Sequence, residues 1–201
     1  MLTNTTGVIL AGGKSSRMGE KDKGLTDIAG NPLVAYVIRR MEPQVNSILI
    51  SANRNSTEYG KYGYAVIKDA TDEFYGPLSG LLSAMQHADT EYILTAPCDS
   101  PFLPLDYAQR MYTALTDNSN KICVAQEEGL IQPVFALVSC SFASSLQDYL
   151  EQGHRKAADW ILKQEPSTVN FSSCGNMFFN MNTPEDKLQL EQMMSNPDHA
   201  N

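Results

Sequence analysis

The 201-residue sequence has no apolar run close to the ~20 residues that a membrane-spanning helix needs. Residues 1–13 lack the positively charged start and the long apolar stretch of a secretory signal peptide. The cysteines are far apart and form no C-x-x-C pair: Cys98, Cys123, Cys140 and Cys174. These absences disfavour a zinc site and a disulfide framework, so a cytoplasmic protein with reduced thiols is expected.

An excess of positive charge is also missing. The chain has 15 basic and 23 acidic residues and a net charge of −8. This balance disfavours binding to nucleic acid or to an anionic membrane, because both require a positive surface. The sequence contains neither an internal repeat nor a low-complexity linker. Residues 1–194 are therefore expected to form one domain, and residues 195–201 a disordered tail.

The standard nucleotide and catalytic motifs are absent as well. The sequence has no Walker A motif and no G-x-G-x-x-G fingerprint. The histidines belong to no motif: His87, His154 and His199. Cys98 has no histidine near it in sequence and is expected to be a packed residue, so no nucleophile–base pair is apparent. Direct phosphoryl or nucleotidyl transfer needs no such pair, because its catalysis depends on positioning and charge neutralisation.

The most informative segment is GVILAGGKSSRMGEKDKG at 7–24. It begins with a short apolar run, Gly7 to Leu10, that predicts a buried strand. Gly12 and Gly13 then allow a sharp turn and the close approach of a ligand. The cations that follow are Lys14, Arg17, Lys21 and Lys23. A glycine loop beside fixed cations is typical of a phosphate site, although a solvated surface loop has the same composition.

Strand and helix signals alternate along the rest of the chain. Pro32 opens a helix whose apolar residues recur at helical spacing up to Met41. Further strands are expected at 45–52, 64–67, 91–96, 121–126, 133–138, 167–171 and 177–181. Further helices are expected at 105–115, 142–151 and 155–163 and after Pro77 and Pro184. This order predicts an α/β fold with a mostly parallel central sheet flanked by helices.

Ligands of such sheets bind at the carboxyl ends of the strands, where this chain has several polar residues. Ser51, Asn53 and Asp69 follow two of the predicted strands. Asp99 follows a third and stands between prolines, as suits a Mg²⁺ ion held mainly by substrate phosphates, although turns also favour aspartate. Gly80 costs about 1 kcal/mol in a helix relative to alanine, which indicates that something packs closely against it.

Several motifs resemble those of the molybdenum cofactor guanylyltransferase family of nucleotidyltransferases. The chain has LAGG at 10–13, RMG at 17–19, DKG at 22–24, GPLSGL at 76–81, PCDSPFLP at 97–104 and NMNTPE at 180–185. The resemblance covers nearly the whole chain. It implies a Rossmann-like nucleotidyltransferase fold. It also implies transfer of GMP from GTP to the terminal phosphate of molybdopterin, with release of pyrophosphate.

The resemblance further implies roles for individual residues. The implied catalytic residues are Arg17, Lys23 and Asp99, with Asp99 as the ligand of Mg²⁺. The implied nucleotide contacts are Leu10, Ala11, Gly12, Gly13, Lys23, Ser51, Asn53, Asp69, Gly80 and Asp99. The implied acceptor-side residues are Gln132, Arg155, Lys156, Asn180 and Asn182. Position 51 departs from the family, which usually has asparagine there, so Ser51 keeps a hydroxyl and lacks the amide.

The resemblance implies GTP and molybdopterin or its molybdenum cofactor as partners, together with molybdenum enzymes or cofactor-delivery proteins. A phosphate-monoester acceptor needs no general base, because its second pKa is about 6 and it is ionised near pH 7. Two alternatives stay open. One is a nucleotidyltransferase that uses CTP, or a sugar or polyol phosphate acceptor. The other is a carrier that binds the nucleotide or cofactor without turnover.

Overall fold

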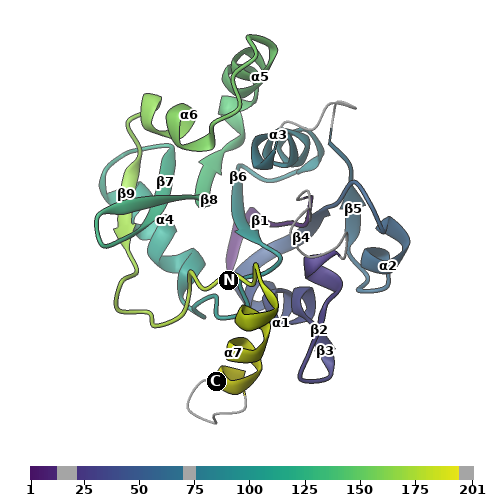
Figure 1. Ribbon diagram of the computed structural model, residues 1–201. Coiled ribbons are helices and arrows are strands. Elements are labelled where there is room, and N and C mark those ends of the chain that lie inside the picture. Colours follow the sequence, from purple (N-terminus) through teal and green to yellow (C-terminus); the bar gives the residue numbers. More distant parts are fainter. Residues whose placement is uncertain (13–21, 70–75, 195–201) are drawn as a thin grey trace.

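The computed structural model describes residues 1–12, 22–69 and 76–194 (Figure 1). Its centre is a seven-stranded sheet with the order β5-β4-β1-β6-β8-β7-β9. The strands are β1 (Leu2–Leu10), β4 (Val45–Ser51), β5 (Ala65–Ile67), β6 (Tyr92–Pro97), β7 (Ile122–Glu127), β8 (Leu130–Ser139) and β9 (Ser167–Asn170). Strands β5, β4, β1 and β6 are parallel, and so are β7 and β9, whereas β8 is antiparallel to both of its neighbours. The sheet is mostly parallel, as predicted.

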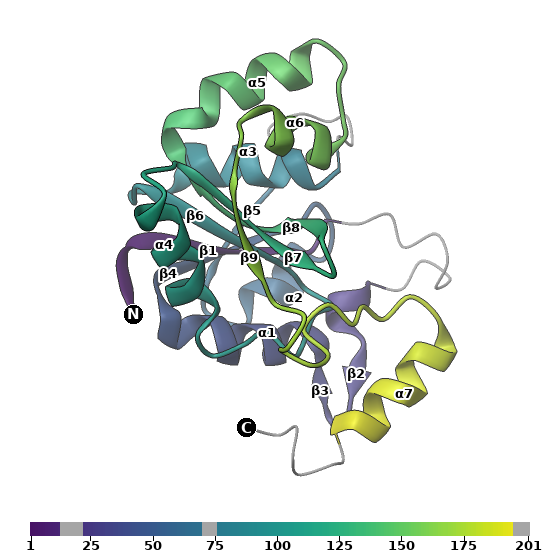
Figure 2. The same ribbon diagram turned by 90° about the vertical axis from the view of Figure 1, so that its left-hand side faces the viewer.

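Helices cover both faces of the sheet. They are α1 (Leu33–Met41), α2 (Ser56–Gly60), α3 (Pro77–His87), α4 (Tyr107–Asp117), α5 (Ala143–Glu151), α6 (Ala157–Lys163) and α7 (Pro184–Met194). Figure 2 shows α3, α5 and α6 on one face and α1, α2 and α4 on the other. A two-stranded sheet of β2 (Asp27–Ile28) and β3 (Asn31–Pro32) precedes α1. Within the described ranges, the model has no helix with the length and apolar character of a membrane span.

Each face of the sheet has its own buried core. One core joins the sheet to α1 and α4 through Val37, Met41, Tyr107 and Met111. The other joins it to α3, α5 and α6 through Leu81, Leu146 and Trp160. A third, smaller cluster contains Ile28, Leu33, Met181 and Leu190. Helix α7 therefore packs near β2 and the start of α1 through an apolar contact of its own.

Strands β6 and β8 separate near the carboxyl end of β6. Along β7, β8 pairs through Ala136 and next through Gln132, so the residues between them bulge out of the ladder. Pro133 lies in this bulge and has no N–H to donate to the ladder, which explains its position. The Ala136 N–H instead donates to Thr95 Oγ1 at 3.1 Å. The opening leaves Val134 free to line the cavity described below.

The strand expected at 177–181 is not formed, and this prediction was wrong. The segment is made of turns, one of which is closed by the Phe179 N–H donating to the Asn176 carbonyl at 3.0 Å. Met177 and Met181 are both fully buried, but in different clusters. The apolar residues of this segment link two cores and do not form one face of a sheet. A short apolar run does not distinguish these cases in sequence.

Candidate active site

A cavity of about 310 Å³ lies at the carboxyl ends of β1, β4 and β6 and beside the start of α3. Most of the predicted nucleotide-binding residues line it: Leu10, Ala11, Gly12, Lys23, Ser51, Asp69, Gly80 and Asp99. Asn53 is not among the lining residues. Gly13 and Arg17 lie outside the described residues. The parallel strands thus bring together side chains that are far apart in sequence, as expected for the carboxyl edge of an α/β sheet.

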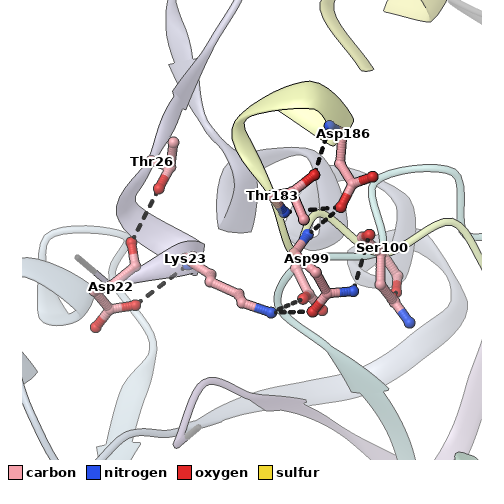
Figure 3. A network of polar contacts seen from close by, with 10 residues as sticks. Asp22, Lys23, Thr26, Asp99, Ser100, Thr183 and Asp186 are labelled. Atoms are coloured by element: carbon pink, nitrogen blue, oxygen red, sulfur yellow. Dashed lines mark hydrogen bonds and ion pairs between the residues drawn. The ribbon is translucent and has the colours of Figure 1, made fainter. Parts of the chain in front are cut away.

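Lys23 and Asp99 form an ion pair at the edge of this cavity. Lys23 Nζ lies 3.4 Å from Asp99 Oδ2, and both side chains are largely shielded, with exposed fractions of 24% and 13%. Figure 3 shows the lysine extending toward the carboxylate. Burial raises the pKa of Asp99, and the Lys23 ammonium limits that rise because it favours the ionised form. The site therefore holds a carboxylate that is shielded from water and whose ionised form is stabilised by a nearby cation.

Asp22 fixes the backbone that presents Lys23. The Asp22 carboxylate accepts hydrogen bonds from the Tyr59 hydroxyl at 2.5 Å and from the Gly24 N–H at 3.2 Å. Asn55 Nδ2 donates to the same carboxylate at 3.1 Å. A Cβ at position 24 would lie 2.5 Å from the Tyr59 hydroxyl and 3.1 Å from Cys98, so only glycine fits there. In the DKG motif, Asp22 therefore anchors the backbone, Lys23 extends toward Asp99, and Gly24 allows a close approach to Tyr59 and Cys98.

Sequence reasoning did not include Asp22 among the site residues, although it lines the cavity. Asp22 belongs to the DKG motif, but its partners, Asn55 and Tyr59, lie at the start of α2 and within it and meet Asp22 only in the fold. Cys98 also lines the cavity. Burial is the main cause that raises the pKa of its thiol well above the ordinary range, and the Asp99 and Asp22 carboxylates add to it. Cys98 is therefore a neutral packed residue, as the sequence predicted, and not a nucleophile.

Asn53 holds Asp69 from two sides. Asn53 Nδ2 donates to Asp69 Oδ2 at 2.8 Å, and the Asp69 N–H donates to Asn53 Oδ1 at 2.9 Å. Burial raises the pKa of Asp69, and the Asn53 amide opposes the rise. Asp69 faces the cavity whereas Asn53 does not line it. In the structure Asn53 therefore contacts Asp69 and does not line the cavity itself.

Ser51 and Gly80 pack against each other between β4 and α3. A Cβ at position 80 would lie 2.5 Å from Ser51 Oγ and 3.0 Å from Leu10 Cδ2. Both distances are shorter than ordinary van der Waals contact. The missing side chain of Gly80 therefore lets α3 approach the ends of β1 and β4, and the close packing expected from the sequence is present.

One of the predicted acceptor-side residues contacts Lys23, and another contacts the residue that follows Asp99. Asn182 Oδ1 accepts a hydrogen bond from Lys23 Nζ at 2.6 Å. Asn180 Oδ1 accepts one from the Ser100 hydroxyl at 2.8 Å, next to Asp99. Residues 177–182 form no strand, so irregular backbone places these two asparagines.

The other three predicted acceptor-side residues have different surroundings. Arg155 Nη1 donates to the carbonyls of Leu150 at 2.7 Å and His154 at 2.6 Å, so it caps the end of α5. Lys156 is exposed and lies 4.0 Å from Asp159. Gln132 lies on β8 beside the bulge. None of these three lines the cavity.

The donor set at the cavity fits one kind of metal site. Magnesium prefers oxygen ligands and is usually held by one or two carboxylates together with substrate phosphates. Asp99 supplies such a carboxylate, and burial has already removed much of its contact with water. The described residues include no group of three or more His, Cys, Asp or Glu side chains that could hold a metal alone. Asp99 thus fits a magnesium ion shared with a phosphorylated ligand.

Residues 7–168 match the family model described as the MobA-like NTP transferase domain. The match covers well over half of the chain. The chain belongs to this family. The protein is therefore a nucleotidyltransferase, and its mostly parallel sheet agrees with this assignment.

Individual relatives agree with this assignment. A molybdenum cofactor guanylyltransferase from Shewanella halifaxensis (strain HAW-EB4) is 41% identical, over 98% of this chain and 98% of its own. Another, from Shewanella putrefaciens (strain CN-32 / ATCC BAA-453), is 43% identical over 91% of this chain and 94% of its own. The crystal structure of molybdopterin-guanine dinucleotide biosynthesis protein A from Archaeoglobus fulgidus has a TM-score of 0.80 at 21% identity and covers 94% of this chain and 98% of its own. At that identity the likeness shows the shared fold.

Proposed function

We propose that this nucleotidyltransferase transfers GMP from GTP to the terminal phosphate of molybdopterin, with or without molybdenum. The observation that carries the proposal is the Lys23–Asp99 pair at the edge of a cavity of about 310 Å³. This volume lies within the range of about 300–1,000 Å³ that is usual for small-molecule sites. The names of the relatives that are about 40% identical support the choice of base and acceptor.

In the proposed reaction, an oxygen of the acceptor phosphate attacks the α-phosphorus of GTP. The bond between the α-phosphorus and the oxygen that bridges it to the β-phosphorus breaks, and pyrophosphate leaves with that oxygen. The products are molybdopterin guanine dinucleotide and pyrophosphate. The acceptor needs no general base, because a phosphate monoester is already ionised near pH 7. The enzyme's task is positioning and charge neutralisation.

Lys23 and Asp99 would provide the charge neutralisation that this reaction needs. The Lys23 ammonium is held where triphosphate oxygens would enter the cavity, and it stabilises the charge on the departing pyrophosphate. Asp99 would hold Mg²⁺, which when bound supplies further neutralisation of that charge. The backbone at Gly12, where no side chain intervenes, would approach the phosphates. Gly13 and Arg17 remain predicted members of the same phosphate site.

Asp69 would recognise the nucleobase. Guanine presents two donors, its N1–H and its 2-amino group, and a carboxylate can accept from both. Asn53 keeps this carboxylate in place through its two hydrogen bonds. Ser51 and Gly80 would shape the wall behind the base. The base site and the phosphate site would then share one cavity, which both Asp69 and Lys23 line.

The acceptor is proposed to bind beside Asn180 and Asn182, which already contact the Lys23–Asp99 neighbourhood. Gln132, Arg155 and Lys156 remain predictions on the acceptor side, and substitution of each would test them. Residues 1–194 are proposed to work as one nucleotidyltransferase domain, because residues beyond 168 contribute to the site of the matched segment.

Replacement of Asp99 by asparagine or alanine tests this proposal. Both variants remove a charged oxygen ligand, and we expect pyrophosphate release to fall by roughly 10²–10³-fold or more. Circular dichroism would show that they stay folded. Asp106→Asn is a matched control, because Asp106 is exposed at the start of α4 and its side chain makes no capping bond. Full activity of the Asp99 variants would refute the metal-binding role.

A further inference from the structure

The C-terminal segment of the chain contacts Lys23 and the residue that follows Asp99. Asn182 Oδ1 accepts from Lys23 Nζ at 2.6 Å, a shorter contact than the 3.4 Å between Lys23 and Asp99. Asn180 bonds the hydroxyl of Ser100, the residue that follows Asp99. This segment lies beyond residues 7–168, which match the family model. The position of the functional lysine therefore depends on a part of the chain outside the matched domain.

Asp186 fixes the backbone of Asn182. Asp186 Oδ2 accepts the N–H of Asn182 at 2.8 Å and the N–H of Thr183 at 2.8 Å. Thr183 Oγ1 in turn accepts the Asp186 N–H at 3.1 Å, which completes a reciprocal capping box at the start of α7. Figure 3 shows Thr183 and Asp186 beside the Lys23–Asp99 pair. One carboxylate oxygen thus ties the helix start to the residue that holds Lys23.

A purely structural role for Asp186 would make it responsible for attaching α7, but other residues do that. Leu190 and Met181, one on each side of Asp186 in sequence, are fully buried with Ile28 and Leu33. Asp186 itself is only partly buried. The apolar cluster keeps α7 on the body of the protein, and the Asp186 bonds decide where the loop before α7 lies.

The charge of Asp186 agrees with such a role. The N–H of Asn182 is the largest of the causes that lower the pKa of Asp186, and the charge of Lys23 acts in the same direction. The carboxylate is therefore ionised at neutral pH, which strengthens the hydrogen bonds that it accepts.

We propose that Asp186 is a positioning residue of the active site: it fixes the Asn182 backbone, so that the Asn182 side chain holds the Lys23 ammonium beside Asp99. The inference rests on the proposed function, since it assigns Lys23 to the phosphates of GTP. The chain of contacts runs from Asp186 to Asn182 and from Asn182 to Lys23, and Asp186 acts on the reaction only through it.

The first test compares Asp186→Ala with Asp186→Asn in pyrophosphate release from GTP. Asp186→Ala removes the acceptor of both bonds, and we expect kcat to fall by roughly 10–100-fold, as is typical when a group supporting a functional side chain is removed. The melting temperature should change little, because Leu190 stays buried. Asp186→Asn keeps one side-chain oxygen, and a single oxygen makes both bonds, so it should restore most of the rate. Glu185→Ala, an exposed acid in the same helical turn, is the matched control and should act like the parent protein.

A double-mutant cycle with Asn182 separates positioning from stability. If Asp186 acts through Asn182, Asp186→Ala should have no further effect on kcat in the Asn182→Ala background, within about twofold. A merely structural role predicts that the two losses multiply and that the melting temperature falls with each. Multiplying losses would overturn the inference, and so would an Asp186→Ala enzyme with the parent rate or an Asp186→Asn enzyme as slow as Asp186→Ala.

The parent enzyme distinguishes failure of the inference from failure of the proposed function. Absence of pyrophosphate release from the parent protein with GTP, Mg²⁺ and molybdopterin would refute the proposed function whatever the variants do. Release by the parent protein with unchanged release by Asp186→Ala would overturn the inference alone. GTP affinity measured by calorimetry gives a readout without turnover, and Asp186→Ala should weaken it through the displaced Lys23.

Discussion

Asp99 is a residue whose surroundings disfavour its ionised form. Its pKa is raised in the folded protein, so the folded state binds a proton at this site more tightly than the unfolded chain does. Stability therefore falls as the pH rises from the ordinary aspartate pKa of about 4 through the raised value, and the loss persists at pH 7. A cation bound beside this carboxylate would favour its ionised form and offset the cost of burying the charge.

We expect Asp99→Asn to stabilise the folded protein even though it lowers activity. Without divalent metal at pH 7, Asp99→Asn should raise the melting temperature, because it removes the desolvated charge. The gain should shrink as the pH is lowered toward about 4, where the parent carboxyl becomes protonated. Thermal unfolding of both proteins across this range, with a chelator present, measures the difference. A lower melting temperature of the variant at pH 7 would show that the ion pair with Lys23 outweighs the burial.

Asn53 leads to a prediction about pH and nucleotide binding. Its amide favours the ionised form of Asp69, whose pKa burial raises. Ionised Asp69 is proposed to bind the base, so the KM for GTP should increase as the pH falls through the pKa of Asp69. Asn53→Ala removes the lowering influence, and the increase should begin at a higher pH than in the parent enzyme. Asn46→Ala, at an exposed position on β4, the strand that precedes Asn53, is the control. If the KM for GTP depends on pH in the same way in Asn53→Ala and in the parent enzyme, Asn53 does not influence the ionisation of Asp69.

The sequence indicated most single residues of the site but not their pairings. Lys23, Asp69 and Asp99 stand out because they follow glycine turns or strand ends, which are local signals. That Asn53 serves Asp69, or that Asp22 is held by Tyr59, depends on residues 16 and 37 positions apart. Such contacts form when strands and helices assemble, and no spacing rule predicts them.

Helix α3 shows how an element can be placed by the lack of a side chain. Gly80 is unfavourable within a helix, yet it allows α3 to approach β1 and β4 where the cavity forms. The helix starts at Pro77, as the sequence predicted, because proline suits the first helical position.

Gly80→Ala should destabilise the protein by about 1 kcal/mol, and by no more than about 2 kcal/mol. The helix-propensity gain of about 1 kcal/mol is smaller than the typical overpacking cost of about 1–3 kcal/mol. The new methyl would meet Ser51 Oγ first, so Ser51→Ala in the same protein should recover part of the loss. Gly60→Ala is the control, since a Cβ there meets nothing within 4 Å. Chemical denaturation measures the loss of stability and its recovery in the double variant, and GTP titration shows whether nucleotide binding changes with them. Equal stability of Gly80→Ala and the parent would contradict the packing account.

At the scale of elements, the predictions based on residues that begin a helix were confirmed, and one prediction based on apolar content was wrong. The helices after Pro77 and Pro184 are present, and the Thr183 cap bonds Asp186 as its motif indicates. The strand expected at 177–181 is absent, because its apolar residues divide between two cores. Capping is decided within one turn of chain, whereas the partners of an apolar run are decided by the whole fold.

At the scale of the molecule, the fold brings three strand ends, the bulge of β8 and a C-terminal segment to one place. Strands β1, β4 and β6 end at the cavity, and β8 opens beside it. Asn182 reaches Lys23 across 159 positions of sequence. The order of strands and helices predicted the sheet, but not the return of the last segment to the first loop, since no local signal encodes that contact.

Pyrophosphate release with Mg²⁺ and molybdopterin, compared for GTP, CTP, ATP and UTP, tests the central claim most directly. Release with GTP alone, and none when molybdopterin is omitted, is the predicted result. Release with CTP alone would contradict the assignment of the base while keeping the mechanism. Tight GTP binding without release, from folded protein with molybdopterin present, would contradict the claim of catalysis and favour a nucleotide carrier.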